Sequence, residues 1–97
     1  MCGRYSLGVQ PDIEARFEAE WVERGWLSPR FNIAPTQTVP TITSSNRRRI
    51  EHMRWGFVPS WAKDVKIGNR LINARAETAA VMPAFRTSFR SKRCLVV

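Results

Sequence analysis

The second residue of the chain is a cysteine, and the sequence opens Met1-Cys2-Gly3-Arg4-Tyr5. Cysteine is small enough for an initiator Met before it to be removed, which would leave Cys2 with a free α-amino group beside its thiol. The reference pKa values of these groups are about 7.7–8.0 and about 8.5, so a part of each is nucleophilic near neutral pH. Such an aminothiol condenses with an aldehyde to a Schiff base, which the thiol closes into a thiazolidine ring. The alternative is that Cys2 is only a small residue at a chain end.

The composition limits the classes of protein to which the chain can belong. Its 97 residues suffice for one small domain, and a hydrophobic content of 43% excludes a disordered tail. Two cysteines, Cys2 and Cys94, are too few for a disulfide scaffold, and with the single His52 they lack the spacing of metal ligands. We therefore expect no metal and no cofactor. Because no apolar signal segment or membrane span is evident, we expect a cytoplasmic protein, associated with the nucleoid if it is bacterial.

The net charge of +8 is unevenly distributed. The segment from Asp12 to Glu23 contains five acids and one base, so it carries −4 and the rest of the chain carries +12. A protein this basic over most of its length usually binds a polyanion such as nucleic acid. The alternative is a solvated surface on which arginines only promote solubility.

The acidic segment is predicted to be a helix that begins with Asp12 as N-cap and ends near Gly25. Its apolar residues recur every four positions and form one stripe: Ile13, Phe17 and Trp21. We expect this stripe to pack on the body of the protein. The acids would then face solvent, away from any nucleic acid.

Strands are predicted over residues 4–7, 39–43, 50–57 and 71–74, and residues 30–35 should be extended because they precede a proline. The two central strands should flank a turn at residues 44–46, after which the triplet Arg47-Arg48-Arg49 would lie exposed. Such a triplet is more often a solvated hairpin tip than a binding site. Along the second of these strands, Met53, Trp55 and Phe57 alternate as one buried face would.

The last third of the sequence predicts a long loop that carries Trp61, then short helical segments over 77–80 and 83–89. Residues 94–97 favour a buried strand in which Cys94 is an inert thiol. Since apolar strand-forming residues continue to Val97, we interpret residues 1–97 as the N-terminal portion of a single larger domain, truncated at its C-terminus. The final strand would then pair with a second chain or with a C-terminal fragment rather than remain a free edge.

Five ordered blocks resemble the SRAP family of SOS-response-associated peptidases, or abasic-site processing proteins: Met1–Tyr5, Arg30–Thr36, Met53–Trp61, Ile72–Thr78 and Cys94–Val97. The resemblance implies an α+β fold, with a curved, mostly antiparallel sheet and a few short helices. It also implies a protein that binds single-stranded DNA at abasic sites and traps the ring-opened sugar aldehyde as a thiazolidine on the terminal cysteine. The word peptidase refers to removal of Met1 by the domain itself.

Matching the blocks residue by residue gives candidate roles. Cys2 would be the nucleophile, and Asn73 would orient the sugar or the attacking amine. Asn32 and the loop to Pro35 would shape the pocket. The resemblance also has gaps, because the family continues into a Gly-aromatic-aromatic-Glu-Trp segment and a later catalytic histidine that these residues lack. His52 lies in a different block.

Three further residues suit DNA on physical grounds. Arg4 and Arg75 could hold phosphates, since a guanidinium binds them bidentately. Trp61 could stack on an unpaired base, which contributes roughly 1–3 kcal/mol per base. Arg4 could instead form a structural ion pair, and Trp61 could be a loop anchor packed on the core. Asn73 could instead cap the helix over Glu77 or merely satisfy backbone groups. We expect Trp55 and Phe57 to belong to the core, and Glu77 to be a buried partner of an arginine rather than a catalytic acid.

Two functions therefore remain open from the sequence. The chain is either part of a self-processed domain that crosslinks to DNA, or a basic module that binds single-stranded nucleic acid without chemistry. An intact Cys2 favours the first, and the missing glutamate and histidine favour the second.

Overall fold

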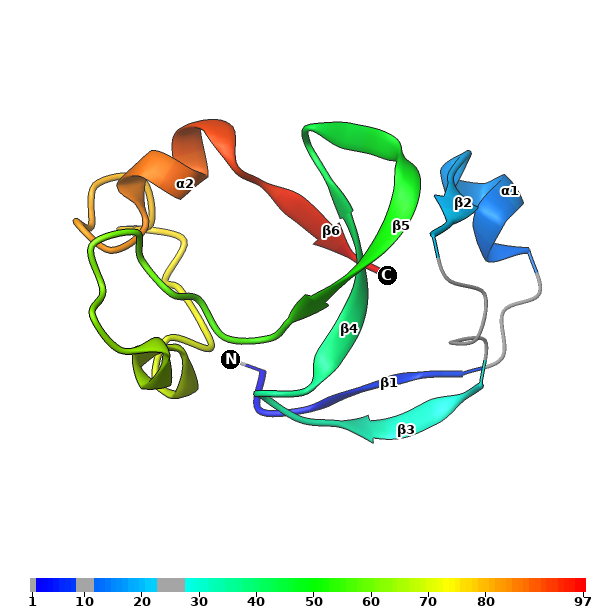
Figure 1. Cartoon of the computed structure of the whole chain (residues 1–97), viewed down its shortest axis with the longest axis horizontal. Coiled ribbons are helices and arrows are strands. Elements are labelled where there is room, and N and C mark those ends of the chain that lie inside the picture. Colours follow the sequence, from blue (N-terminus) through cyan, green and yellow to red (C-terminus); the bar gives the residue numbers. More distant parts are fainter. Residues whose placement is uncertain (1, 9–11, 23–27) are drawn as a thin grey trace.

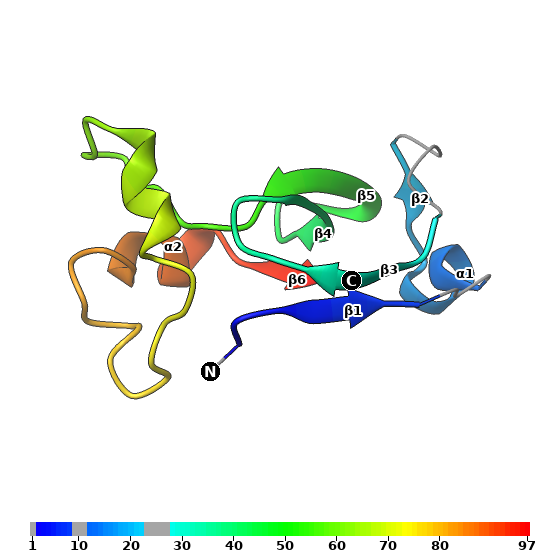
Figure 2. The same cartoon turned by 90° about the horizontal axis from the view of Figure 1, so that it is seen from below.

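The computed structural model describes residues 2–8, 12–22 and 28–97 (Figures 1 and 2). The fold is α+β, as predicted. The elements follow in the order β1 (Tyr5–Leu7), α1 (Ile13–Phe17), β2 (Glu20–Trp21), β3 (Arg30–Ile33), β4 (Thr38–Thr43), β5 (Asn46–Arg54), the 3₁₀ helix η2 (Val65–Asn69), α2 (Arg86–Ser91) and β6 (Cys94–Val96). Within the described residues, none of the helices is long and apolar enough to cross a membrane.

The strands of the described residues form a ribbon, β1-β3, and a sheet in the order β2-β5-β4-β6. The predicted hairpin is confirmed: β4 and β5 are antiparallel and are joined by a turn at residues 44 and 45. Its register is irregular near the turn, because the pairs Thr41–Glu51 and Thr43–Asn46 leave one residue of β4 against four of β5. In this bulge, β5 turns to pair in parallel with β2, at Arg49 and Ile50.

The helix predicted over residues 12–25 is wrong in length. α1 ends at Phe17, because Glu18 adopts the left-handed conformation with φ 52° and ψ 41°. Trp21 therefore lies in β2, where its backbone N–H donates to Glu14 Oε1 at 3.3 Å. Asp12 occupies the N-cap position without a side-chain capping bond. Gly25, the predicted end, lies outside the described residues.

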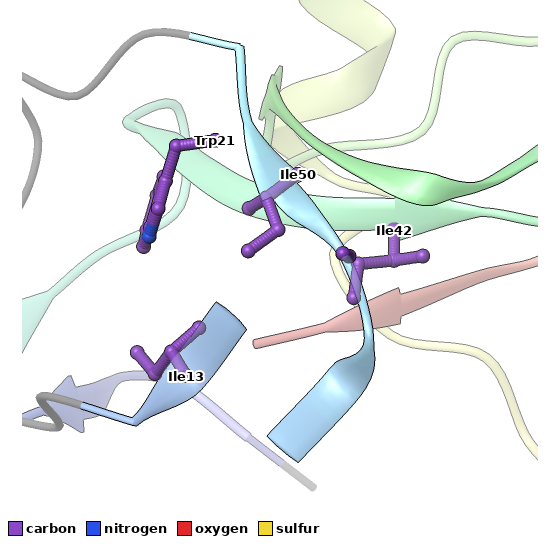
Figure 3. Close-up of a cluster of buried hydrophobic side chains, with 5 residues drawn as sticks. Ile13, Trp21, Ile42 and Ile50 are labelled. Atoms are coloured by element: carbon purple, nitrogen blue, oxygen red, sulfur yellow. The ribbon is translucent and has the colours of Figure 1, made fainter. Parts of the chain in front are cut away.

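The apolar stripe nevertheless becomes buried. Ile13 and Trp21 belong to one hydrophobic cluster with Ala19, Ile42 and Ile50. Figure 3 shows the four larger side chains of this cluster. Phe17 packs against it half-buried. Full burial of one isoleucine side chain contributes roughly 1.5–3 kcal/mol. The pattern thus identified the core residues correctly, although the backbone that presents them is a helix followed by a strand.

The segment from Trp55 to Phe85 contains less regular structure than the sequence predicts. The expected strand over 71–74 is absent, and its first residue instead accepts a hydrogen bond of 2.9 Å from Phe57 N. The expected helix over 77–80 is a series of turns, and α2 begins only at Arg86. Gly56 has φ +131°, and a Cβ on it would collide with the carbonyl oxygen of Gly68. Only glycine permits this crossing of the chain.

Two predictions of burial are corrected. Met53 is 46% exposed, and Trp55 and Phe57 lie beyond the end of β5, half-buried. The sheet ends at Arg54, so the alternation across these three residues does not correspond to one buried face.

β6 is present but is not buried. It pairs antiparallel with β4 of the same chain, and Val97 N continues the pairing to Pro40 O at 3.1 Å. Cys94 is exposed, and Leu95 and Val96 are 59% and 57% exposed. Among the described strands none pairs with the outer edge of β6. Because Leu95 and Val96 point to opposite faces of the sheet and both are exposed, the described residues cover neither face of β6.

Candidate active site

Asn73 holds the backbone of Cys2 from both sides. Its Oδ1 accepts a hydrogen bond from Cys2 N at 3.3 Å, and its Nδ2 donates to Cys2 O at 2.9 Å. These two bonds fix which end of the amide is oxygen, since one partner is a donor and the other an acceptor. The Cys2 thiol is free and exposed. The arrangement therefore orients the main chain of Cys2 and leaves its sulfur accessible.

The clamp excludes one alternative for Asn73. An amide that is bonded to Cys2 does not cap a helix at Glu77, and residues 77–80 form turns. Glu77 is exposed, which corrects the expectation of a buried partner for an arginine.

Trp55 positions the segment that carries Asn73. Its indole Nε1 donates to Ile72 O at 3.0 Å, directly before Asn73 in the chain. The ring also contacts Tyr5 edge-on, with centroids 5.8 Å apart. Tyr5 lies in β1, three residues after Cys2, so the Trp55 side chain contacts both segments that the clamp joins, one carrying Cys2 and the other carrying Asn73. Sequence reasoning assigned Trp55 only to the core. The signal it missed is that a half-buried indole N–H needs an acceptor.

Tyr5 itself is an unusual group within this site. Its hydroxyl is buried and has no hydrogen-bond partner among the described residues. Burial raises the pKa of the Tyr5 phenol above its usual value of 10.0, and the charge of Arg30 opposes this shift. The phenol therefore stays neutral over the range in which Cys2 would react.

Arg4 and Asn32 are brought together across the β1-β3 ribbon. Arg4 Nη1 donates to Asn32 Oδ1 at 3.1 Å, and both residues are exposed. The partner of Arg4 among the described residues is thus a neutral amide rather than a carboxylate. Its positive charge remains uncompensated beside Cys2, as phosphate binding would require.

The turn that contains Pro35 is also tied to this site. Pro35 follows β3 and is half-buried, and the next residue, Thr36, has φ 76° and donates through its N–H to Trp55 O at 2.9 Å. The backbone carbonyl of Trp55 thus accepts the hydrogen bond from the Pro35 turn, and its indole N–H donates to the segment that carries Asn73.

Trp61 and Arg75 are placed on the surface, without a recorded contact to Cys2 among the described residues. Trp61 is 62% exposed on the loop after β5, which argues against the alternative of a loop anchor. The Arg75 side chain is exposed, while its carbonyl accepts from Ala79 N at 2.9 Å in the following turn. Within the described part of the chain, no three His, Cys, Asp or Glu side chains gather as a metal site needs.

The whole chain, residues 1–97, matches the family model for SOS response associated peptidase (SRAP). The chain belongs to the SRAP family. The abasic site processing protein YoqW of Bacillus subtilis (strain 168) is 42% identical over 99 residues, which cover 99% of this chain and 44% of YoqW. The abasic site processing protein HMCES of Gallus gallus is 30% identical over 121 residues and is covered to 36%. This SRAP chain thus spans less than half the length of these relatives.

Solved structures support the fold. A crystal structure of a protein from Bacteroides thetaiotaomicron superposes with a TM-score of 0.81, covering 98% of this chain and 45% of that one at 24% identity. A protein from Bordetella bronchiseptica gives a TM-score of 0.64 at 20% identity over 91% of this chain. At such identities the likeness concerns the SRAP fold alone.

Proposed function

We propose that this SRAP chain forms the lesion-binding part of an abasic-site processing protein, in which Cys2 joins covalently to the ring-opened sugar of single-stranded DNA. The observation that carries the proposal is the clamp of Asn73 on Cys2, since it orients the main-chain nitrogen and leaves the thiol free. The named relatives are abasic site processing proteins, which supports the same substrate.

The proposed reaction has three steps. Hydrolysis of the Met1–Cys2 peptide bond by the domain itself consumes one water and releases the Cys2 amine. The amine then adds to the sugar aldehyde and loses one water to give a Schiff base. Finally the thiol adds across the C=N bond: sulfur bonds to the carbon, and the thiol proton ends on the nitrogen. The thiazolidine ring that results shields the strand from cleavage.

Asn73 would act on orientation throughout this sequence. Its Oδ1 accepts from the nitrogen of Cys2 before processing and can accept from the free amine afterwards, which directs the nitrogen lone pair away from the amide. Holding a nucleophile in a reactive geometry accelerates a reaction without contributing to the bond formed. Removing this side chain should therefore slow crosslinking rather than abolish it.

The DNA contacts in this proposal come from exposed side chains around the clamp. Arg4, held by Asn32, would bind a phosphate next to the lesion. Arg75, which stands two residues after Asn73 in the chain, would bind a second phosphate. Trp61 would stack on a neighbouring base, and the Pro35 turn would limit the pocket. Such contacts are independent of DNA sequence. In a cell the protein would act where the DNA is, in the cytoplasm and at the nucleoid if it is bacterial.

The proposed partners also include polypeptide. The exposed apolar side chains of β6 and the greater length of the relatives support a second chain or a C-terminal portion that packs on this edge. That polypeptide would supply the glutamate and histidine that the resemblance implies. We expect the 97 residues alone to crosslink slowly or not at all.

The test is a denaturing gel with an oligonucleotide that contains one abasic site, using the domain with its C-terminal portion restored. The parent should give a heat-stable protein–DNA band, and Cys2→Ser should give none, because only a Schiff base can form. Asn73→Ala should slow band formation roughly tenfold to a hundredfold. Asn73→Asp, which keeps the acceptor and loses the donor, is the matched control. Bands of equal intensity with Cys2→Ser and the parent would place the nucleophile elsewhere.

The second candidate is a module that binds single-stranded nucleic acid without chemistry. It is supported by the exposed side chains of Arg4 and Arg75, which can bind phosphates whether or not Cys2 reacts. Intact-mass spectrometry decides whether Met1 is removed. A chain that keeps Met1, binds the oligonucleotide and gives no band even with the C-terminal portion restored would establish this candidate.

A further inference from the structure

Two basic segments meet at the end of the sheet that bears the β4–β5 turn. One is the bulge of β5, Arg47 to Arg49, and the other is Lys92-Arg93, which connects α2 to β6. Arg93 O accepts from Ser44 N at 2.8 Å, and Arg93 N donates to Ser44 Oγ at 3.3 Å. We name these five residues the basic ridge: Arg47, Arg48, Arg49, Lys92 and Arg93.

The register explains why the two segments are close. Cys94, Thr43 and Asn46 form one row across β6, β4 and β5. Neighbouring strands lie about 4.8 Å apart, so the two outer residues of this row are about 10 Å apart. Arg93 directly precedes Cys94, and Arg47 directly follows Asn46, so both segments of the ridge begin beside this row. The bulge raises the density of positive charge further, because it exposes three consecutive arginines to solvent. In a regular strand one of them would point inward.

The charge of the ridge is uncompensated. All five side chains are exposed, and among the described residues they form no hydrogen bond or ion pair. The one recorded contact is that of the Arg93 guanidinium with the Phe89 ring, 5.0 Å from its centroid. Glu20 is paired with Arg49 through the backbone of β2, and the half-buried Glu51 lies further along β5. Exposed guanidinium groups without carboxylate partners are suited to phosphates.

We propose that the basic ridge is a second phosphate-binding surface, which holds the DNA strand at a distance from the lesion bound at Cys2. This rests on the proposed function, because it is the same DNA molecule that both surfaces bind. In Figure 1 the β4–β5 turn lies at the top of the view, whereas β1, which follows Cys2 and Arg4 in the chain, lies near the bottom. A strand must therefore extend across the molecule to reach both surfaces, and only a sufficiently long strand can do so.

The size of the protein sets the length that is needed. Its longest extent is 38 Å. Phosphates follow one another about every 3.4 Å along one strand of a duplex, so about 11 of them match this extent. When the strand carries an abasic site, strands of about 6 nucleotides should bind at Cys2 alone, and strands of about 30 should reach the ridge as well.

The experiment measures the salt dependence of binding to single strands of about 6 and about 30 nucleotides that each carry one reduced abasic site, which has no aldehyde and cannot crosslink, by fluorescence anisotropy with the full chain. Each phosphate neutralised contributes about −0.7 to the slope of log K against log salt. The triple variant R47Q/R48Q/R49Q should reduce the magnitude of the slope by about 2 on the long strand and leave the short one unchanged. R47K/R48K/R49K, which keeps the charge, should retain most of the parent slope. Lys92→Gln with Arg93→Gln should reduce it by about 1.4, through the other half of the ridge.

The outcomes separate this inference from the proposed function. If both Gln variants leave the slope on the long strand unchanged, the ridge does not bind DNA and the inference is overturned. It is also overturned if the slope falls equally on the short and the long strand, because the ridge would then be part of the Cys2 site. Weaker binding to phosphatidylglycerol vesicles, with binding to DNA unchanged, would assign the ridge to a membrane and overturn it too. Crosslinking of a short abasic strand by the complete domain tests the proposed function alone, and the triple variant should leave that band unaltered.

Discussion

The sheet and the segment that follows it are held together by different forces. All buried hydrophobic residues of the described chain lie between Ile13 and Ile50, whereas residues 55–85 bury only Pro59 and Gly68. That second segment nevertheless carries Asn73, Trp61 and Arg75. It is fixed by hydrogen bonds such as that of Trp55 Nε1 to Ile72 O, and by the contact of two glycines. The scaffold is thus built by burial and the site by polar contacts.

The difference has an energetic consequence. A hydrogen bond contributes about 1 kcal/mol net, less than the burial of one large side chain. A segment with few buried contacts opens locally at a lower free energy than the core. The site should therefore be disturbed by changes that leave the sheet intact, whereas damage to the sheet should destroy both.

The largest effect is expected from Ile50→Ala. Ile50 is fully buried in the cluster of Figure 3, so the substitution removes transfer free energy and leaves a cavity. The free energy of unfolding should fall by about 2–5 kcal/mol, measured by urea denaturation. Val65→Ala, at a position 61% exposed in η2, should change it by no more than about 0.5 kcal/mol. Equal effects of the two substitutions would contradict the assignment of the core.

A smaller and more local effect is expected from Gly56→Ala. The added Cβ meets the carbonyl of Gly68 at a φ of +131°, so the crossing of the chain must open. The strain should cost about 1–3 kcal/mol and should appear in hydrogen exchange as faster exchange of Phe57 and Leu71, with Ile42 and Ile50 protected as before. Gly3→Ala, where a Cβ finds open space, is the control. Uniform loss of protection would mean that the two regions are one cooperative unit.

The smallest effect concerns pH. The pKa of Tyr5 is raised by burial, so the folded state binds its proton more tightly than the unfolded state. The stability from this group is complete below pH 10, the unfolded value, and is lost as the pH rises through the folded pKa. Tyr5→Phe should flatten this decline in denaturation measured between pH 9 and pH 11. A parent whose stability does not fall in this range would contradict the shift.

The contrast between the regions also explains what could be predicted from sequence. Ile13 and Trp21 were assigned to the core because burial leaves a periodic signal, even though Glu18 ends the helix between them. The β4–β5 hairpin followed from its turn residues. The prediction of a strand over 71–74 was wrong. The carbonyls of Leu71 and Ile72 accept from Phe57 N and from the Trp55 indole rather than from a neighbouring strand, and such contacts produce no periodic pattern of residues in the sequence.

The site shows the same division. Cys2 was evident from its chemistry, and Asn73 came from a resemblance to a family. Neither spacing nor composition indicates that Asn73 would bond to the backbone of Cys2, or that Asn32 would hold Arg4. The sequence also predicts a buried Cys94, because its neighbours are apolar. Cys94 is exposed together with Leu95 and Val96, so the described residues cover neither face of β6, and whether a strand is covered is a property of tertiary structure.

The clamp between Cys2 and Asn73 also sets an order of events during folding. It joins residues 71 positions apart, and closing a loop of that length in a flexible chain costs about 4 kcal/mol of entropy, more than two hydrogen bonds return. It can therefore close only after the pairing of β1 with β3 and the contact of Tyr5 with Trp55 have shortened the loop. The residue that is synthesised second is among the last to reach its place. In an unfolded or newly made chain Cys2 follows Met1 without this clamp, and the arrangement of Cys2 and Asn73 arises only with the finished fold.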